Sequence, residues 1–308
     1  MKTAVLLATH NGLRWLPEQV DSILGQQGVS VRLFVSDDAS TDGAPAWLLA
    51  RAEQDERVTL LPQNGAYGSA AWNFYRLLRD ADFLTTDYVA FSDQDDIWHP
   101  DKLARACRKL AETQADGYSS NVMAFWPDGR RQLVNKAQPQ QKYDYLFEAA
   151  GPGCTYVMTS AFVHAVQCQL KNLIAMDAAL PAHHDWFCYA LCRMQGKRWV
   201  IDARPSMDYR QHGHNEVGVN DGIQAGRTRL RKVASGWYRR EVLLLAHMGR
   251  SLRPDDSDLA ALVFRLERGS WLDRLALVFS VCRLRRRLRD RLALAMLFLS
   301  GLFFRTKR

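Results

Sequence analysis

The sequence predicts an α/β fold, in which a parallel sheet carries helices on both faces and a basic helical extension follows. Apolar runs of strand type alternate with stretches of helical spacing, such as Leu16 to Leu24. The strand-like runs are residues 3–9, 31–36, 58–61 and 88–92. A chain of 308 residues with 47% hydrophobic and 24% charged side chains excludes a disordered or collagen-like protein.

Charge divides the chain into two parts. Residues 1–222 carry 21 basic and 26 acidic side chains, whereas residues 223–308 carry 20 and 7. The second part shows helical patterns throughout. We therefore predict a catalytic domain over 1–222 and a helical extension over 223–308, whose partner is a polyanionic surface, either nucleic acid or anionic lipid.

The first two predicted strands end in polar segments, Thr9-His10-Asn11-Gly12 and Asp37 to Gly43. Ligands of open α/β sheets bind at the carboxyl ends of the strands, and side-chain oxygens there accept hydrogen bonds from a base or ribose. Each segment alone is equally compatible with a turn and a helix cap. No GxGxxG or GxxxxGK[ST] motif is present, which disfavours dinucleotide and Walker phosphate loops.

The fourth strand runs directly into Asp93-Gln94-Asp95-Asp96. Three carboxylates within four residues repel one another unless a cation lies between them, and hard oxygen ligands suit Mg²⁺ or Mn²⁺. The alternative is an acidic turn that caps a helix beginning near Pro100. The apolar residues on both sides of the cluster favour the metal site, because unpaired charge is costly there.

Taken in order, these segments resemble the family-2 inverting glycosyltransferases of the GT-A fold, and most of all the bacterial rhamnosyltransferases of O-antigen and capsule assembly. The resemblance covers roughly residues 3–217. It implies a nucleotide-diphosphate-sugar donor, with dTDP-rhamnose favoured, and Mg²⁺ or Mn²⁺ bound at the DxD element. The donor residues it implies are Thr9, Asn11, Asp38 facing the base and Asp93 facing the ribose, with Asp95 binding the metal.

Two later segments complete the implied site. In His183-His184-Asp185-Trp186, the resemblance makes Asp185 the general base that deprotonates the acceptor hydroxyl, with Trp186 and Gly153 on the acceptor side. The alternatives are a helix N-terminal charge at Asp185 and a plain turn at Gly153. In the segment from Tyr209 to Asn215, Arg210 is expected to bind phosphate, and His212 to bind metal or phosphate.

The extension shows an amphipathic pattern near its end. Leucines recur at spacings of three and four from Leu284 to Leu302, and arginines take the opposite face. Such a helix either packs on the body of the protein or lies on an anionic leaflet by an attraction that salt weakens. The strong basic excess favours the leaflet. We predict a cytoplasmic protein, peripheral to the inner membrane.

The predicted function is the metal-dependent transfer of a sugar, rhamnose favoured, to a hydroxyl of a lipid-linked or polysaccharide acceptor. One alternative is the same chemistry with a UDP-hexose donor. A sugar nucleotidyltransferase would need a Gly-rich triphosphate loop near its start, which Asn11-Gly12 does not provide. A basic nucleic-acid-binding protein would leave the acidic segments unexplained, so no nucleic-acid partner is expected.

Overall fold

The computed structural model describes residues 1–213 and 233–305, which form two compact units. The α/β unit contains residues 1–137, 150–188 and 197–213. The helical unit contains residues 138–149, 189–196 and 233–305. Two segments of the first 222 residues therefore belong with the C-terminal helices.

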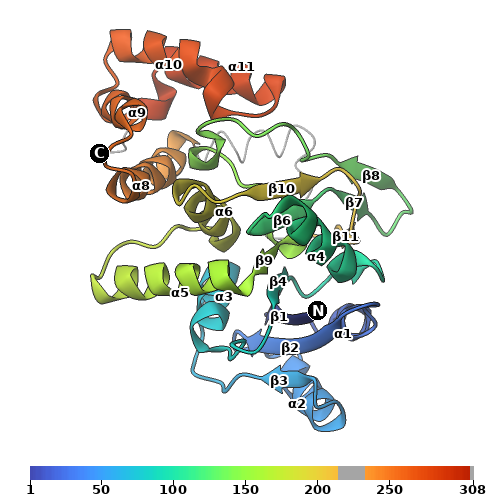
Figure 1. Cartoon of the computed structure of the whole chain (residues 1–308). Helices are drawn as coiled ribbons and strands as arrows, with labels where there is room; N and C mark the ends of the chain where they lie inside the picture. The colour runs from blue at the N-terminus through green and yellow to red at the C-terminus, as the bar shows by residue number, and fades with distance from the viewer. Residues whose placement is uncertain (214–232, 306–308) are drawn as a thin grey trace. The chain divides into compact units, whose positions relative to one another are not determined.

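A seven-stranded sheet forms the core of the α/β unit (Figure 1). Its strand order is β10-β6-β9-β4-β1-β2-β3, and β9 alone runs antiparallel to its neighbours. The strands are β1 (Lys2–Thr9), β2 (Ser30–Asp37), β3 (Val58–Leu60), β4 (Tyr88–Ser92), β6 (Gly117–Ser120), β9 (Val157–Thr159) and β10 (Trp199–Asp202). The four predicted strands are confirmed as β1 to β4. Since β1 lies between β2 and β4 and parallel to both, the carboxyl ends of these strands share one edge.

Helices cover both faces of this sheet, as the sequence predicts. The α1, α2 and α4 helices bury Val20, Leu48 and Leu103 in one core with alternate residues of β1 and β2. The α3 and α5 helices pack on the opposite face, where Phe74 lies against Phe91. The helices are α1 (Leu16–Leu24), α2 (Ala44–Gln54), α3 (Ala70–Asp80), α4 (Lys102–Thr113) and α5 (Ser160–Ala175). The next helix, α6 (His184–Met194), begins in this unit, and its residues from 189 on belong to the helical unit.

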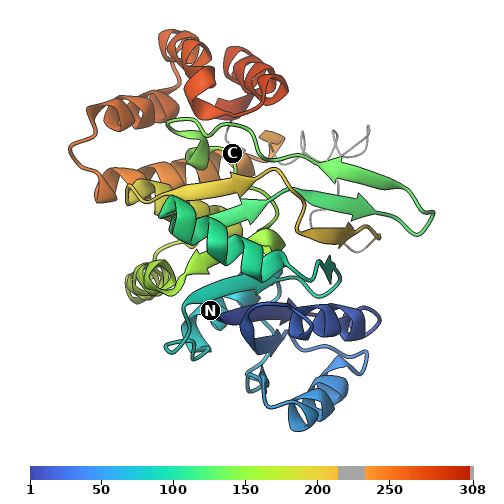
Figure 2. The ribbon, with the colours of Figure 1, turned by 45° about the vertical axis from the view of Figure 1, so that its right-hand side comes forward.

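A second sheet of order β5-β11-β7-β8 begins just after residues 93–96, which we call the acidic segment. Its strands are β5 (Ile97–Trp98), β7 (Val122–Phe125), β8 (Arg131–Val134) and β11 (Met207–Arg210). Figure 2 shows the β7–β8 hairpin extending beyond the main sheet. Neither β8 nor β11 is among the four strands predicted from the sequence. Because β11 pairs with β5, it brings Arg210 and the residues after it to the acidic segment.

The helical unit contains a buried polar centre at Asp144, in the short 3₁₀ helix η1 (Asp144–Leu146). Its carboxylate accepts hydrogen bonds from Tyr189 (3.0 Å) and Arg193 (3.1 Å), and Arg286 lies 3.8 Å away. The helices of this unit are α8 (Trp237–Leu252), α9 (Ser257–Arg268), α10 (Trp271–Leu284), α11 (Leu288–Leu299) and the 3₁₀ helix η3 (Leu302–Phe304).

The prediction of a single amphipathic helix near the end of the chain is wrong, because α10 ends at Leu284 and α11 begins at Leu288. At the break, the Glu148 carboxylate accepts the backbone N–H of Arg286 at 2.8 Å. The guanidinium of Arg285 donates to the carbonyl of Phe147 at 2.6 Å. These two arginines therefore point into the helical unit and do not form an outer basic face. Within residues 1–213 and 233–305, no helix combines the length and apolarity needed to cross a bilayer.

Candidate active site

Gln94, the middle residue of the DxD element, joins β4 to β1 at the carboxyl edge of the sheet. Its amide oxygen accepts hydrogen bonds from the Thr9 hydroxyl (2.6 Å) and the His10 N–H (2.8 Å). A Cβ atom at Gly12 would lie 2.1 Å from this oxygen. Gly12 thus leaves room for the Gln94 amide in this position, and Thr9 contacts the same amide.

Asn11 connects the first loop to the loop after β2. Its side-chain oxygen accepts the Thr41 N–H at 2.8 Å, and its own N–H donates to the Ser40 hydroxyl at 2.7 Å. Asn11 has a φ of 47°, in the left-handed region that asparagine tolerates better than most residues. The two predicted donor loops are therefore held together as one surface.

Asp38 is buried, and its carboxylate accepts the N–H groups of Tyr67 and of Gly68, the latter at 2.9 Å. The segment before α3 consequently folds over the end of β2. Arg76 supports the same segment by placing its guanidinium over the Tyr67 ring, 5.2 Å from its centroid. Arg76 was not predicted from the sequence, since a single arginine in a helix has no distinguishing pattern.

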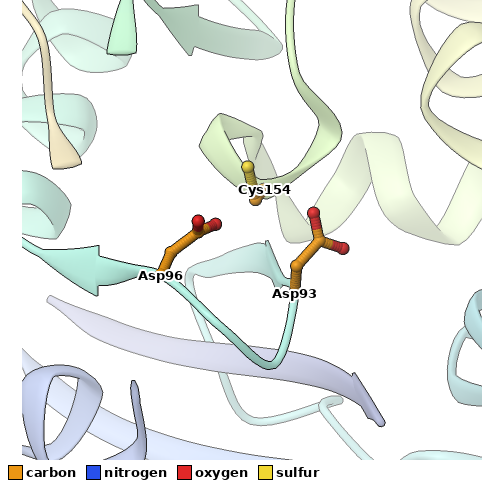
Figure 3. Close-up of side chains that lie close together, drawn as sticks. All are labelled: Asp93, Asp96 and Cys154. Atoms are coloured by element: carbon orange, nitrogen blue, oxygen red, sulfur yellow. The ribbon is translucent and has the colours of Figure 1, made fainter. Parts of the chain in front are cut away.

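Asp93 and Asp96 meet the thiol of Cys154, so that one ligand atom of each lies within 4.8 Å of the others (Figure 3). Burial, together with Asp95 and Asp93, holds the pKa of Asp96 well above its usual range. Burial also raises the pKa of Cys154 well above the ordinary value. Cys154 is therefore a thiol when no cation is bound, and a metal ligated by its sulfur would displace that proton.

Asp95 faces His212 across the site. The Oδ2 atom of Asp95 lies 2.7 Å from Nε2 of His212, and both side chains are largely buried. Burial raises the pKa of Asp95, and His212 opposes that shift. The His212 ring stacks on Trp15, with 4.0 Å between centroids and 9° between planes. The structure thus brings together the two predicted metal ligands, although they lie far apart in sequence.

This pair fits a divalent cation. Neighbouring ligands of an octahedral Mg²⁺ lie about 3 Å apart, because each metal–ligand bond is about 2.1 Å long. The 2.7 Å between Oδ2 and Nε2 is a hydrogen bond, which a cation bound by both atoms would replace. A cation also relieves the repulsion within the acidic segment. His214 lies outside the described residues.

Arg210 reaches the acidic segment but does not point to open solvent. Its Nε donates to the carbonyl of Asp95 at 2.9 Å, and its guanidinium pairs with Glu18 of α1. The Arg210 N–H donates to Asp96 at 3.1 Å. Arg210 therefore braces the loop that carries the three aspartates.

Lys102 is fully buried beneath the site, and its role could not be predicted from the sequence. Its ammonium donates to the carbonyl of Cys154 at 2.6 Å and lies 3.2 Å from the centroid of the Trp98 ring. Burial lowers the pKa of Lys102 to about 7. A lysine at the start of a helix normally faces solvent, so only the packing reveals this one.

Asp185 lies in the first turn of α6, beside the turn that contains Gly153. A Cβ atom at Gly153 would lie 2.9 Å from the Cβ atom of Asp185, so glycine permits this approach. The next residue, Cys154, contacts the acidic cluster. Adjacent residues of one turn therefore contact the predicted base and the acidic cluster.

The neighbours of Asp185 are buried. Trp186 has little exposed surface, and His184 stacks on Phe74 with 3.8 Å between ring centroids. Burial lowers the pKa of His184 to about 4, so this ring stays neutral at pH 7. Asp185 itself is half-buried, and both of its neighbours in sequence are buried aromatic side chains.

The α/β unit has the GT-A fold, and its joined loops and acidic segment lie at the carboxyl edge of the sheet, where ligands of such folds bind. The chain belongs to glycosyltransferase family 2, because the family model described as "Glycosyl transferase family 2" matches residues 4–162. It is 39% identical over 308 residues to the dTDP-rhamnosyl transferase RfbG of Shigella flexneri, covering 96% of this chain and 100% of that protein.

Other similarities agree with this assignment. The chain is 25% identical over 223 residues to the amylovoran biosynthesis glycosyltransferase AmsB of Erwinia amylovora, covering 67% of this chain and 68% of that protein. Among solved structures, residues 1–349 of S. aureus TarS in complex with UDP-GlcNAc match with a TM-score of 0.55 and 14% identity. That match covers 98% of this chain and 89% of TarS 1–349, and it supports the fold.

Proposed function

We propose that this enzyme transfers rhamnose from dTDP-rhamnose to a hydroxyl of a lipid-linked or polysaccharide acceptor, with inversion at the anomeric carbon. The observation that carries this proposal is the full-length similarity to a dTDP-rhamnosyl transferase, at 39% identity. The acidic segment supports it, because Asp95 together with His212 offers ligands for the divalent cation that a nucleotide diphosphate binds.

The donor occupies the carboxyl edge of β1, β2 and β4. Asp95 and His212 hold Mg²⁺ or Mn²⁺, which neutralises the diphosphate charge when bound. Asp38 faces the base and Asp93 the ribose. Thr9 and Asn11 shape the loop beneath the nucleotide through their contacts with Gln94 and Thr41. Arg210 contributes positive charge near the phosphates while it braces the acidic loop.

Asp185 is the general base. Its carboxylate takes the proton from the acceptor hydroxyl as that oxygen attacks the anomeric carbon from the side opposite the nucleotide. The C–O bond to the diphosphate breaks in the same step, and the nucleotide leaves with the electron pair. Gly153 leaves room beside Asp185 on the acceptor side, and Trp186 supports that side from within the unit.

The proposed acceptor also indicates where in the cell the enzyme acts. A lipid-linked glycan lies at a membrane surface, and the basic helical unit suits the cytoplasmic face of the inner membrane. We propose peripheral association there.

The test measures binding and turnover of dTDP-rhamnose by the full-length protein, beside UDP-glucose and UDP-GlcNAc, with Mn²⁺ or with EDTA. We expect dTDP-rhamnose alone to bind and turn over, and only with the cation. Asp95→Asn should weaken Mn²⁺ binding at least about 100-fold, whereas the exposed loop variant Asp82→Asn should not. Preference for a UDP-hexose would overturn the donor assignment, and full activity in EDTA would overturn the metal site.

A further inference from the structure

Large apolar side chains line the solvent side of α10 and α11. Phe279 is 86% exposed, Leu288 69% and Trp271 68%, which are high values for such residues. The set is Trp271, Leu272, Leu275 and Phe279 on α10, and Leu288, Leu292, Met296 and Leu299 on α11; we call it the apolar face. Spacings of three and four place each group along one stripe of its helix.

The two helices pack against each other, as Figure 1 shows, so their stripes belong to one helical pair. Leu277 and Leu284 of α10 and Phe298 of α11 fill the interior of the helical unit. The apolar face is therefore additional to the side chains that the fold needs for its core.

Charge around the apolar face is positive. From Trp271 to Leu299 the chain has seven arginines and two aspartates, and five arginines remain when the inward-pointing Arg285 and Arg286 are left out. Both aspartates are paired with arginine: Asp273 with Arg268 at 2.7 Å, and Asp290 with Arg285 at 3.5 Å. This excess opposes close approach of a second copy of the same surface, but it attracts an anionic lipid surface.

We propose that the apolar face inserts into the headgroup and acyl boundary of an anionic bilayer, with Trp271, Phe279 and Leu288 as its main anchors. The idea rests on the peripheral membrane association proposed above and names the surface and mode of contact. Insertion of apolar side chains depends only weakly on salt, unlike the purely electrostatic attraction expected from the sequence.

Several arginines form ion pairs within the helical unit. These pairs favour insertion of the apolar face into the bilayer over a purely electrostatic attraction. Arg286 is buried against Glu148 and Asp144, and Arg283 pairs with Asp258 at 2.7 Å. Fewer positive charges thus reach solvent than the sequence indicates. The apolar side chains, in contrast, are exposed.

The experiment measures co-sedimentation of the full-length protein with equimolar phosphatidylglycerol and phosphatidylcholine vesicles, at about 0.1 M and about 0.5 M NaCl. The test variant is Phe279→Ser with Leu288→Ser. The matched control is Leu84→Ser with Met176→Ser, which changes side chains of 72% and 76% exposure in the α/β unit. Donor binding and thermal unfolding are measured for every protein.

We expect the wild type and the control to bind vesicles at both salt concentrations, with at most a twofold loss at the higher one. The Phe279/Leu288 variant should bind at least tenfold more weakly while it keeps donor binding and thermal stability. Unchanged vesicle binding by this variant would overturn the proposal. Loss of wild-type binding at high salt would assign docking to the arginines, and a wild-type dimer that the variant dissociates would assign the face to a second copy. Because donor specificity is measured separately, its failure leaves the vesicle result interpretable.

Discussion

Two ring stacks hold the histidines of the active site. Trp15 covers His212 at 4.0 Å, and Phe74 covers His184 at 3.8 Å. A ring that is already stacked loses little conformational freedom when a ligand binds beside it. Trp15 and Phe74 therefore fix the orientation of the two histidine rings. The two histidines differ in surroundings: His212 faces a carboxylate, whereas His184 is enclosed.

Replacement of Trp15 tests its role as a positioning residue. Trp15→Ala should weaken Mn²⁺ binding about tenfold, because the His212 ring is then free to leave Asp95. Trp15→Phe should restore most of that affinity, since a phenyl ring can still stack. Paramagnetic resonance of free Mn²⁺ measures the affinity without donor. Trp72→Ala, at an exposed tryptophan of α3, is the control, and equal affinities for it and Trp15→Ala would exclude the positioning role.

Replacement of the proposed base separates binding from chemistry. Asp185→Asn should retain donor affinity but lower kcat at least about 1000-fold, because an amide of the same shape cannot take the acceptor proton. Isothermal titration with the donor and turnover with acceptor provide the two measurements. A raised KM with unchanged kcat would show instead that Asp185 only binds.

Because His184 is buried, we expect the protein to lose stability in mild acid. Its pKa is about 4 in the folded protein and about 6.5 in the unfolded chain, so the unfolded state takes up a proton first as the pH falls. The free energy of unfolding should decrease between pH 6.5 and pH 4 by up to about 3 kcal/mol, a loss that is absent above pH 6.5. Urea unfolding at several pH values measures it. His184→Phe should flatten this slope, whereas the control His164→Gln should leave it; a wild-type slope in His184→Phe would assign the loss to other groups.

At the scale of helices and strands, local pattern predicted β1 to β4 correctly because these strands are continuous apolar runs. It failed where a distant partner decides the structure. β8 is mostly exposed and β11 carries mixed residues, so neither has an apolar signature. In the gap between α10 and α11, Arg286 donates its N–H to Glu148, a contact that no helical spacing reveals.

The Arg286 contacts should contribute strongly to the stability of the helical unit. Arg286→Met leaves Asp144 buried with one cation fewer, and breaking a buried pair in this way costs about 3–5 kcal/mol. The exposed Arg289→Met should cost less than about 1 kcal/mol, although it also loses an aspartate partner. Urea unfolding, followed by far-ultraviolet circular dichroism, compares the two. Equal losses would mean that Asp144 is satisfied by Tyr189 and Arg193 alone.

At the scale of the whole molecule, the segments of the candidate site could be predicted from the sequence, but the contacts that hold these segments in place could not. Asp93, Asp95 and Asp185 are distinctive because carboxylates directly follow a strand or open a helix. Lys102, Arg76 and Trp15 have no such signature, and only packing reveals them. The charge division near residue 222 is real, yet residues 138–149 and 189–196 belong with the C-terminal helices, which no composition shift indicates.

The contact between Glu148 and Arg286 also sets an order of events during synthesis. The two residues are separated by 138 positions, so at about 5–20 residues per second Glu148 waits on the order of 10 s for its partner. Until Arg286 has left the ribosome, Glu148 lacks this partner, and Asp144 has Arg193 but not yet Arg286. The nascent chain therefore completes its helical unit last, and a chaperone that shields residues 138–149 would act within that interval.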